Sequence, residues 1–103
     1  PTLTISSPRP NRNTGPLSMI RIGAADAASG VDPASLSVTA SVAINGRAGG
    51  AELADLGTWN SDGVFSLPLA TPVQVLPSSR LTVRIRDRAG NVTTQVARFS
   101  VQP

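Results

Sequence analysis

The amino-acid sequence predicts an all-β fold, a single antiparallel β-sandwich. Short extended segments, in which apolar and polar residues alternate, are separated by turn-forming residues about every 8–12 positions, which is typical of sandwiches of about seven strands. No segment repeats its apolar residues with a sustained helical period. The 103 residues suit one domain (1–103), and the 40% apolar content is enough for one modest core.

The first half of the chain divides into three expected strands. The first covers residues 2–6 and is followed by a polar segment that prolines interrupt. The second runs from Leu17 to about Ala25. The parity of the apolar residues changes near Ser18–Met19, which indicates either a bulge there or a strand with both faces partly covered. The third covers residues 35–44, where apolar residues alternate with small or hydroxyl residues. The strong turn signal Asn45–Gly46 follows.

The second half is clear except for residues 47–59. Within that stretch, residues 51–56 fit either one helical turn or a ragged strand. Residues 64–70 form a strand in which Pro68 favours an edge position, because proline cannot donate to the sheet ladder. The final segments predict a hairpin: residues 81–86 and 97–101 alternate apolar with polar or charged residues, and the chain turns between them.

The composition argues against catalysis. Cysteine, histidine, tyrosine and lysine are all absent. Without them the chain lacks a thiolate nucleophile, the commonest general base and any Ser-His-Asp triad, so we do not expect an enzyme. All nine basic residues are arginine, as a GC-rich bacterial genome would produce, and the net charge of +3 is too small to indicate nucleic-acid binding. No apolar run is long enough to span a membrane.

Three segments carry a family resemblance. They read Asp26-Ala-Ala-Ser-Gly-Val-Asp32, Val42-Ala-Ile-Asn-Gly46 and Asp87-Arg-Ala-Gly-Asn91. In this order they make the chain, from Leu3 to Val101, resemble bacterial immunoglobulin-like (fibronectin type III-like) β-sandwich modules, except over residues 49–63. The resemblance implies a sandwich of about seven strands. It also implies one of several modules in a secreted or cell-surface multidomain protein. Such modules serve as spacers, in adhesion, or as accessory domains beside an exported enzyme. Proline at both ends, Pro1 and Pro103, favours a module excised from a larger protein.

Four residues in these motifs could form a calcium site at one end of the sandwich. They are Asp26, Asp32, Asp87 and Asn91. Calcium prefers six to eight oxygen ligands, and loops at one end of the sandwich could bring such oxygens together. The alternative is that these side chains accept hydrogen bonds from backbone N–H groups of their own turns. The low density of carboxylates favours this alternative, and no other cofactor is expected.

The single tryptophan is the candidate for carbohydrate binding. Trp59, with Asn60 and Asp62 beside it, lies in an expected loop where an exposed indole could stack on a sugar ring. Carbohydrate-binding modules usually present several aromatic residues, however, and Phe65 and Phe99 are expected in the core. We therefore favour the alternative that Trp59 caps one end of the sandwich.

Three arginines should share the outer face of the final hairpin. They are Arg84, Arg86 and Arg98, with Arg21 as a further candidate. Such a face could bind a polyanion or an acidic partner. The alternative is a solvated face whose charge prevents edge-to-edge pairing of sheets. No aromatic residue is interleaved to stack on bases, which weighs against nucleic acid.

These observations lead to one leading function and two alternatives. We expect a non-catalytic structural, spacer or interaction module that spaces or orients neighbouring domains of the same exported bacterial protein. One alternative is an accessory module that binds a polysaccharide or a surface protein, with Trp59 contacting a carbohydrate. The other is a linker domain made rigid by calcium.

Overall fold

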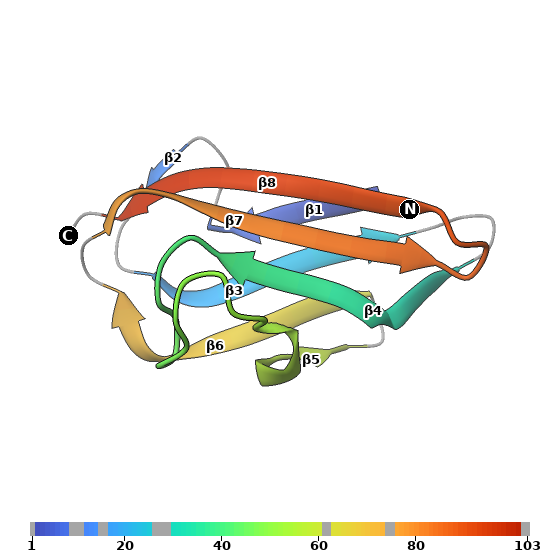
Figure 1. The fold of residues 1–103 in the computed structure, drawn as a ribbon, viewed down its shortest axis with the longest axis horizontal. Coiled ribbons are helices and arrows are strands. Elements are labelled where there is room, and N and C mark those ends of the chain that lie inside the picture. The colour runs from blue at the N-terminus through green and yellow to red at the C-terminus, as the bar shows by residue number, and fades with distance from the viewer. Residues whose placement is uncertain are drawn as a thin grey trace.

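The structure is a computed structural model that describes residues 2–8, 12–14, 17–25, 30–60, 63–73 and 76–101. Within these residues two four-stranded sheets pack face to face (Figure 1). Sheet A contains, in spatial order, β1 (Thr2–Ser7), β3 (Leu17–Ala25), β6 (Val64–Val73) and β5 (Thr58–Trp59). Sheet B contains β2 (Arg12–Thr14), β8 (Val92–Val101), β7 (Leu76–Asp87) and β4 (Val31–Ala40). The predicted all-β sandwich is confirmed.

The strand order is that of an immunoglobulin-like sandwich. In that plan the first, second, fifth and fourth strands form one sheet, and the third, sixth and seventh form the other. Sheet A has this order with β1, β3, β6 and β5, and β4, β7 and β8 supply the second set. β2 has no counterpart in this seven-strand order. Its three residues pair in parallel with β8, whereas the other described strand pairs are antiparallel.

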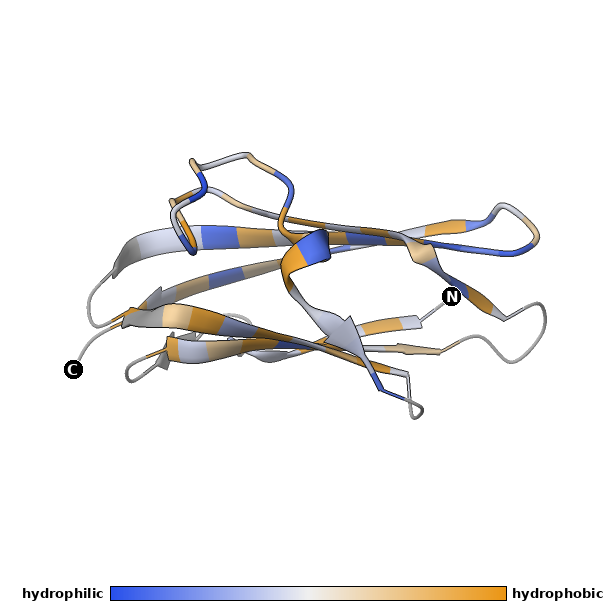
Figure 2. Cartoon of the chain, turned by 90° about the horizontal axis from the view of Figure 1, so that it is seen from below, coloured by the Kyte–Doolittle hydropathy of each residue, from blue (hydrophilic) through white to orange (hydrophobic). Residues whose placement is uncertain are grey.

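Side chains from both sheets meet between the layers and form one hydrophobic core. Along the strands, hydrophobic positions alternate with hydrophilic ones (Figure 2). The largest fully buried side chains include Ile20, Ile22, Leu53, Phe65, Leu67, Leu81 and Ile85. The molecule is elongated, with extents of 41 × 24 × 23 Å. No helix of the described residues is long and apolar enough to cross a membrane.

Of the two alternatives for the second predicted strand, the bulge is the one present in β3. The pairing of β3 with β6 shifts register between Leu17 and Met19. As a result Leu17 and Ile20 are both buried, although strict alternation would place residues three positions apart on opposite faces. The change of apolar parity was therefore a correct signal of backbone irregularity.

The third predicted strand, residues 35–44, is wrong at both ends. β4 already begins at Val31, because its first residues pair with the end of β7. It ends at Ala40. The next residue, Ser41, bonds to β7 through its side chain as well as its backbone, because Ser41 Oγ accepts from Arg80 N at 2.9 Å. A side-chain oxygen thus replaces a backbone carbonyl in the ladder, and the chain leaves the sheet.

Residues 41–57, called the crossing segment below, lead from β4 in sheet B to β5 in sheet A. The predicted turn at Asn45–Gly46 is confirmed, and both residues have positive φ, 51° and 78°, as a tight type I′ hairpin turn requires. The segment then follows the free edge of β4, where Gly50 N and Leu53 N donate to carbonyls of that strand at 2.8 Å. One helical turn, η1 (Ala54–Leu56), comes next, so the helical alternative was right for part of this stretch.

Candidate functional site

The described end of the first motif, residues 30–32, meets the third motif, residues 87–91, at one end of the sandwich. Arg88 N donates to the carbonyl of Gly30 at 3.0 Å. Val31, at the start of β4, is paired with Asp87, at the end of β7. The strand order therefore brings Gly30 and the Asp87 turn, which are far apart in the sequence, into contact.

Asp87 holds its turn together. Its carboxylate is buried, with the residue 4% exposed, and Oδ1 accepts from Ala89 N at 2.9 Å and from Asn91 N at 2.8 Å. The other oxygen accepts from Asn91 Nδ2 at 2.9 Å. Gly90, with φ of 93°, supplies the left-handed conformation that closes the loop. This geometry fits the turn role that we considered for Asp87 and Asn91.

The predicted calcium ligands do not form a cation cage in the described residues. Asp32 Oδ1 accepts from Ala34 N at 3.2 Å, and its Oδ2 lies 4.0 Å from Arg86 Nη2. A cation at Asp87 would compete with the N–H donors that its oxygens already accept. Asp26 lies outside the described residues, and among those described no three His, Cys, Asp or Glu side chains gather. Calcium binding therefore stays a prediction without further support.

Trp59 packs against the core and is half-buried. It pairs with Phe65 across β5 and β6, and the two rings meet edge to face with centroids 5.5 Å apart. Asn60 contacts the start of β6, since its Oδ1 accepts from Val64 N at 3.0 Å. Asp62 lies outside the described residues. These contacts fit a tryptophan that covers the edge of the core better than an indole presented to a sugar.

The three predicted arginines lie on the outer face of sheet B, but one expected companion does not. Arg84 and Arg86 on β7 and Arg98 on β8 are exposed. Arg80 joins them, because it pairs with Arg98 directly across the hairpin. Arg80 and Arg84 are four residues apart on β7, so the alternation of side chains would have predicted Arg80 on the same face. Arg21 was wrongly associated with them, since it lies on β3 in sheet A.

These four residues are called the arginine face: Arg80, Arg84, Arg86 and Arg98. Arg86 has a carboxylate nearby, the Asp32 oxygen at 4.0 Å, and that pair is solvent-exposed. Among the described residues, Arg80, Arg84 and Arg98 form no ion pair. The face is thus a positively charged surface for which the described part of the chain offers little neutralisation.

Glu52 was not expected to have a structural role, and it fixes the crossing segment to β4. One carboxylate oxygen accepts from Ser37 Oγ at 2.6 Å, and the other accepts from Val38 N at 2.6 Å and from two N–H groups of its own turn. Partial burial pushes the pKa of Glu52 upward, but these hydrogen bonds outweigh it, so its pKa lies below the ordinary value. The carboxylate therefore acts in place of a neighbouring strand at this edge.

Arg47 and Asp55 fasten the crossing segment to itself. Two guanidinium nitrogens of Arg47 donate to the two carboxylate oxygens of Asp55, at 2.5 and 2.9 Å. The same guanidinium also donates to the carbonyl of Glu52 at 2.8 Å. The paired hydrogen bonds lower the pKa of Asp55 and raise that of Arg47. Both carboxylates of this segment, Glu52 and Asp55, are thus engaged in structural contacts.

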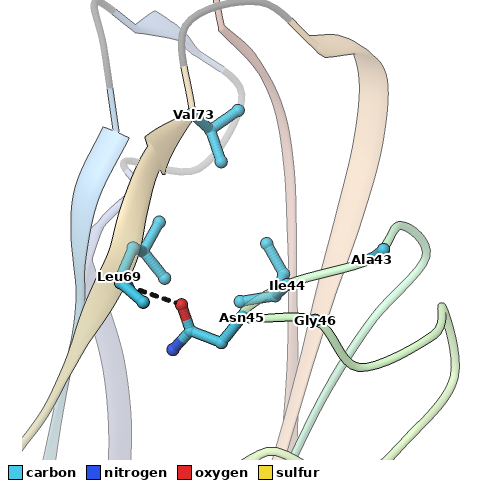
Figure 3. Close-up of a pocket in the computed structure, with 7 residues that line it drawn as sticks. Ala43, Ile44, Asn45, Gly46, Leu69 and Val73 are labelled. Atoms are coloured by element: carbon cyan, nitrogen blue, oxygen red, sulfur yellow. Dashed lines mark hydrogen bonds between the residues drawn. The ribbon is translucent and has the colours of Figure 1, made fainter.

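A shallow groove of about 470 Å³ opens beside the Asn45–Gly46 turn (Figure 3). It is lined by Ala43, Ile44, Asn45, Gly46, Leu69, Ala70 and Val73. Among the described lining residues Asn45 has the only polar side chain, and its amide is already used: Oδ1 accepts from Ala70 N at 2.7 Å and Nδ2 donates to Pro68 O at 3.1 Å. Asn45 thereby bonds to β6 where that strand has passed β5, in agreement with the edge position expected for Pro68. The described lining residues provide no acid, base or nucleophile.

Comparison with known proteins supports the fold. The structure is similar to the crystal structure of CopC from Methylosinus trichosporium OB3b, with a TM-score of 0.63 and 15% sequence identity, over 99% of this chain and 95% of that one. At this identity the likeness shows a shared β-sandwich fold. No protein-family model matches the chain, and no curated protein matches it by sequence.

Proposed function

We propose that the chain is a non-catalytic, rod-like module that spaces and orients neighbouring domains of an exported bacterial protein. The observation that carries this proposal is the path of its first and last strands. β1 begins beside Ala25, at the end of the sandwich where the Gly30 and Asp87 turns meet, whereas β8 starts at that end and finishes at the other (Figure 1). A chain that enters and leaves at opposite ends of a 41 Å long body holds its neighbours apart along that axis.

The covered sheet edges support the same proposal. Exposed strand edges invite pairing with another chain. Here the crossing segment follows the edge of β4, and the amide of Asn45 bonds to β6 beyond the end of β5. Repeated modules in a chain must avoid pairing with one another, and a sandwich with covered edges on this side is suited to that requirement.

The side-chain chemistry supports a module without catalysis. Asp87, Glu52 and Asp55 accept hydrogen bonds that hold turns and edges in place. The chain has no histidine, cysteine, tyrosine or lysine to serve as a base or nucleophile beside them. A secreted or cell-surface location, and neighbouring domains as partners, are part of the proposal and rest on the family resemblance described above.

The proposal is tested first on the isolated chain. We expect a folded monomer: a cooperative thermal transition in circular dichroism, and a sedimentation coefficient of one 10.5 kDa chain that does not change with concentration. A chain that is unfolded on its own, or that self-associates at micromolar concentration, would contradict an independent spacer module.

A further inference from the structure

The arginine face is an extended, exposed surface. Arg80, Arg84 and Arg86 are of one parity along β7, and a rise of about 3.3 Å per residue gives this row a length of about 20 Å. Arg98 lies beside the row on β8, directly opposite Arg80. The four guanidinium groups are therefore spread over a band that follows the strand direction.

The charge of this face is not used by the fold. Among the described carboxylates, those of Asp87, Glu52 and Asp55 accept hydrogen bonds elsewhere, and only that of Asp32 approaches the face, at 4.0 Å from Arg86. Like charges directly opposite each other on two strands, as Arg80 and Arg98 are, destabilise a sheet. Packing therefore gives no reason for this arrangement, whereas an anionic partner would neutralise it.

Beside the arginines lie threonines and two exposed valines, Val96 opposite Thr82 and Val92 opposite Arg86. Thr94 pairs with Arg84 across the hairpin, and Thr82 pairs with Thr39 of β4. The chain has three aromatic residues, and none contributes to this face, because Phe99 is buried and Trp59 and Phe65 belong to sheet A.

We propose that the arginine face binds an acidic polysaccharide, a sugar polymer that bears carboxylate or sulfate groups. Guanidinium groups bind such oxyanions through two parallel N–H donors, and a row of them suits charges that repeat along a polymer. The threonine hydroxyls between them can exchange hydrogen bonds with sugar hydroxyls. This inference goes beyond the spacer function and does not depend on it.

Other anionic partners fit this face less well. Single-stranded nucleic acid is usually bound with aromatic residues that stack on bases, and protein interfaces are enriched in aromatic residues at their centre. Surface helices that bind membranes insert large apolar side chains, whereas the exposed large hydrophobic residues among those described are two valines of this face, Val92 and Val96, 50% and 47% exposed. A sugar polymer is bound through charge and hydroxyl groups, and this face provides both beside its two valines.

The experiment measures binding of the 103-residue chain to polygalacturonate and to dextran sulfate by isothermal titration calorimetry, with neutral dextran for comparison. We expect at least one acidic polymer to bind and neutral dextran not to bind. Arg84→Gln should weaken binding about threefold, and the double variant Arg80→Gln/Arg98→Gln about tenfold, as expected for the loss of exposed ion pairs. Comparing the two acidic polymers distinguishes carboxylate from sulfate recognition.

Arg21→Gln is the matched control, because it removes the same charge from an exposed position in sheet A. It should change the affinity less than twofold. The proposal is overturned if neither acidic polymer binds at low ionic strength or if Arg21→Gln weakens binding as much as Arg84→Gln. Equally strong, arginine-dependent binding of duplex DNA or of anionic phospholipid vesicles would also overturn it, since the face would then not select a sugar polymer.

Discussion

Two carboxylates hold this molecule together in contrasting ways. Asp87, which is buried, accepts from backbone N–H groups two and four positions further along its own turn. Glu52, which is exposed, accepts from Ser37 and Val38, fifteen and fourteen positions away on the edge of β4. The first stabilises a local turn and the second joins two separate segments. The comparison shows one chemical device, a carboxylate that accepts backbone N–H groups, used once for folding a loop and once for covering a sheet edge.

The largest expected effect on the free energy of unfolding is that of removing the Asp87 carboxylate. Asp87→Ala leaves the N–H groups of Ala89 and Asn91 without their acceptor in a turn that packs against Gly30. We expect a loss of about 2–4 kcal/mol in the free energy of unfolding, measured by urea denaturation. Asp87→Asn keeps one acceptor oxygen and should lose less. Equal losses for the two variants would contradict the role given to the carboxylate.

The next effect concerns the packing of the crossing segment. Gly57 lies against the Phe65 ring and the carbonyl of Ser66, and a methyl group at that position would overlap both. Gly57→Ala should therefore destabilise the protein by about 1–3 kcal/mol in the same assay. Gly23→Ala is the matched control, because the added methyl group would meet only the Thr4 carbonyl, at 4.0 Å. Similar effects from both substitutions would mean that the segment is not tightly packed.

Glu52 should show a smaller effect that depends on pH. Its pKa is below the ordinary value in the folded protein, so its stabilisation is complete above the unfolded-state pKa near 4.5 and is lost as the pH falls through the lower folded-state value. Glu52→Gln should cost about 1 kcal/mol at neutral pH, given the screening of an exposed group, and should approach no cost in acid. Urea denaturation of both proteins at neutral pH and at a pH below the folded-state pKa of Glu52 tests this prediction. A loss of stability by Glu52→Gln that is the same at both pH values would refute it.

The smallest effect is expected for Arg47 and Asp55. Their side chains are 35% and 64% exposed, and an exposed ion pair contributes little and is screened by salt. In a double-mutant cycle with Arg47→Gln and Asp55→Asn, the coupling should be below that of Glu52 with Ser37 at low ionic strength. It should vanish at high salt, and a coupling that survives high salt would show that the pair is more than a surface contact.

The same contrast explains which parts of the structure could be predicted from the sequence. The β7–β8 hairpin, the bulge in β3 and the Asp87 turn depend on residues close together in the chain, and local alternation or turn chemistry reveals them. The role of Glu52 depends on Val38, and that of Asn45 on Pro68 and Ala70, contacts that exist only after the sheets have assembled.

The arginine face lies between these two cases. The parity of Arg84 and Arg86 placed them correctly on one face of the predicted hairpin. Arg80 was omitted because the predicted strand began at Leu81, whereas β7 already begins at Leu76. Arg21 was assigned to the face because no local pattern tells which of two sheets a strand enters.

The most direct test of the spacer account is the distance between the two ends of the sandwich. The chain contains no cysteine, so Thr2→Cys and Ser78→Cys introduce two unique attachment sites for spin labels, both at exposed positions. Double electron–electron resonance should give one narrow distance distribution centred at about 30 Å, the length of the β7 strand between Ser78 and the Asp87 turn. A broad distribution, or a much shorter distance that places both ends on the same side, would contradict a rigid module that holds its neighbours apart.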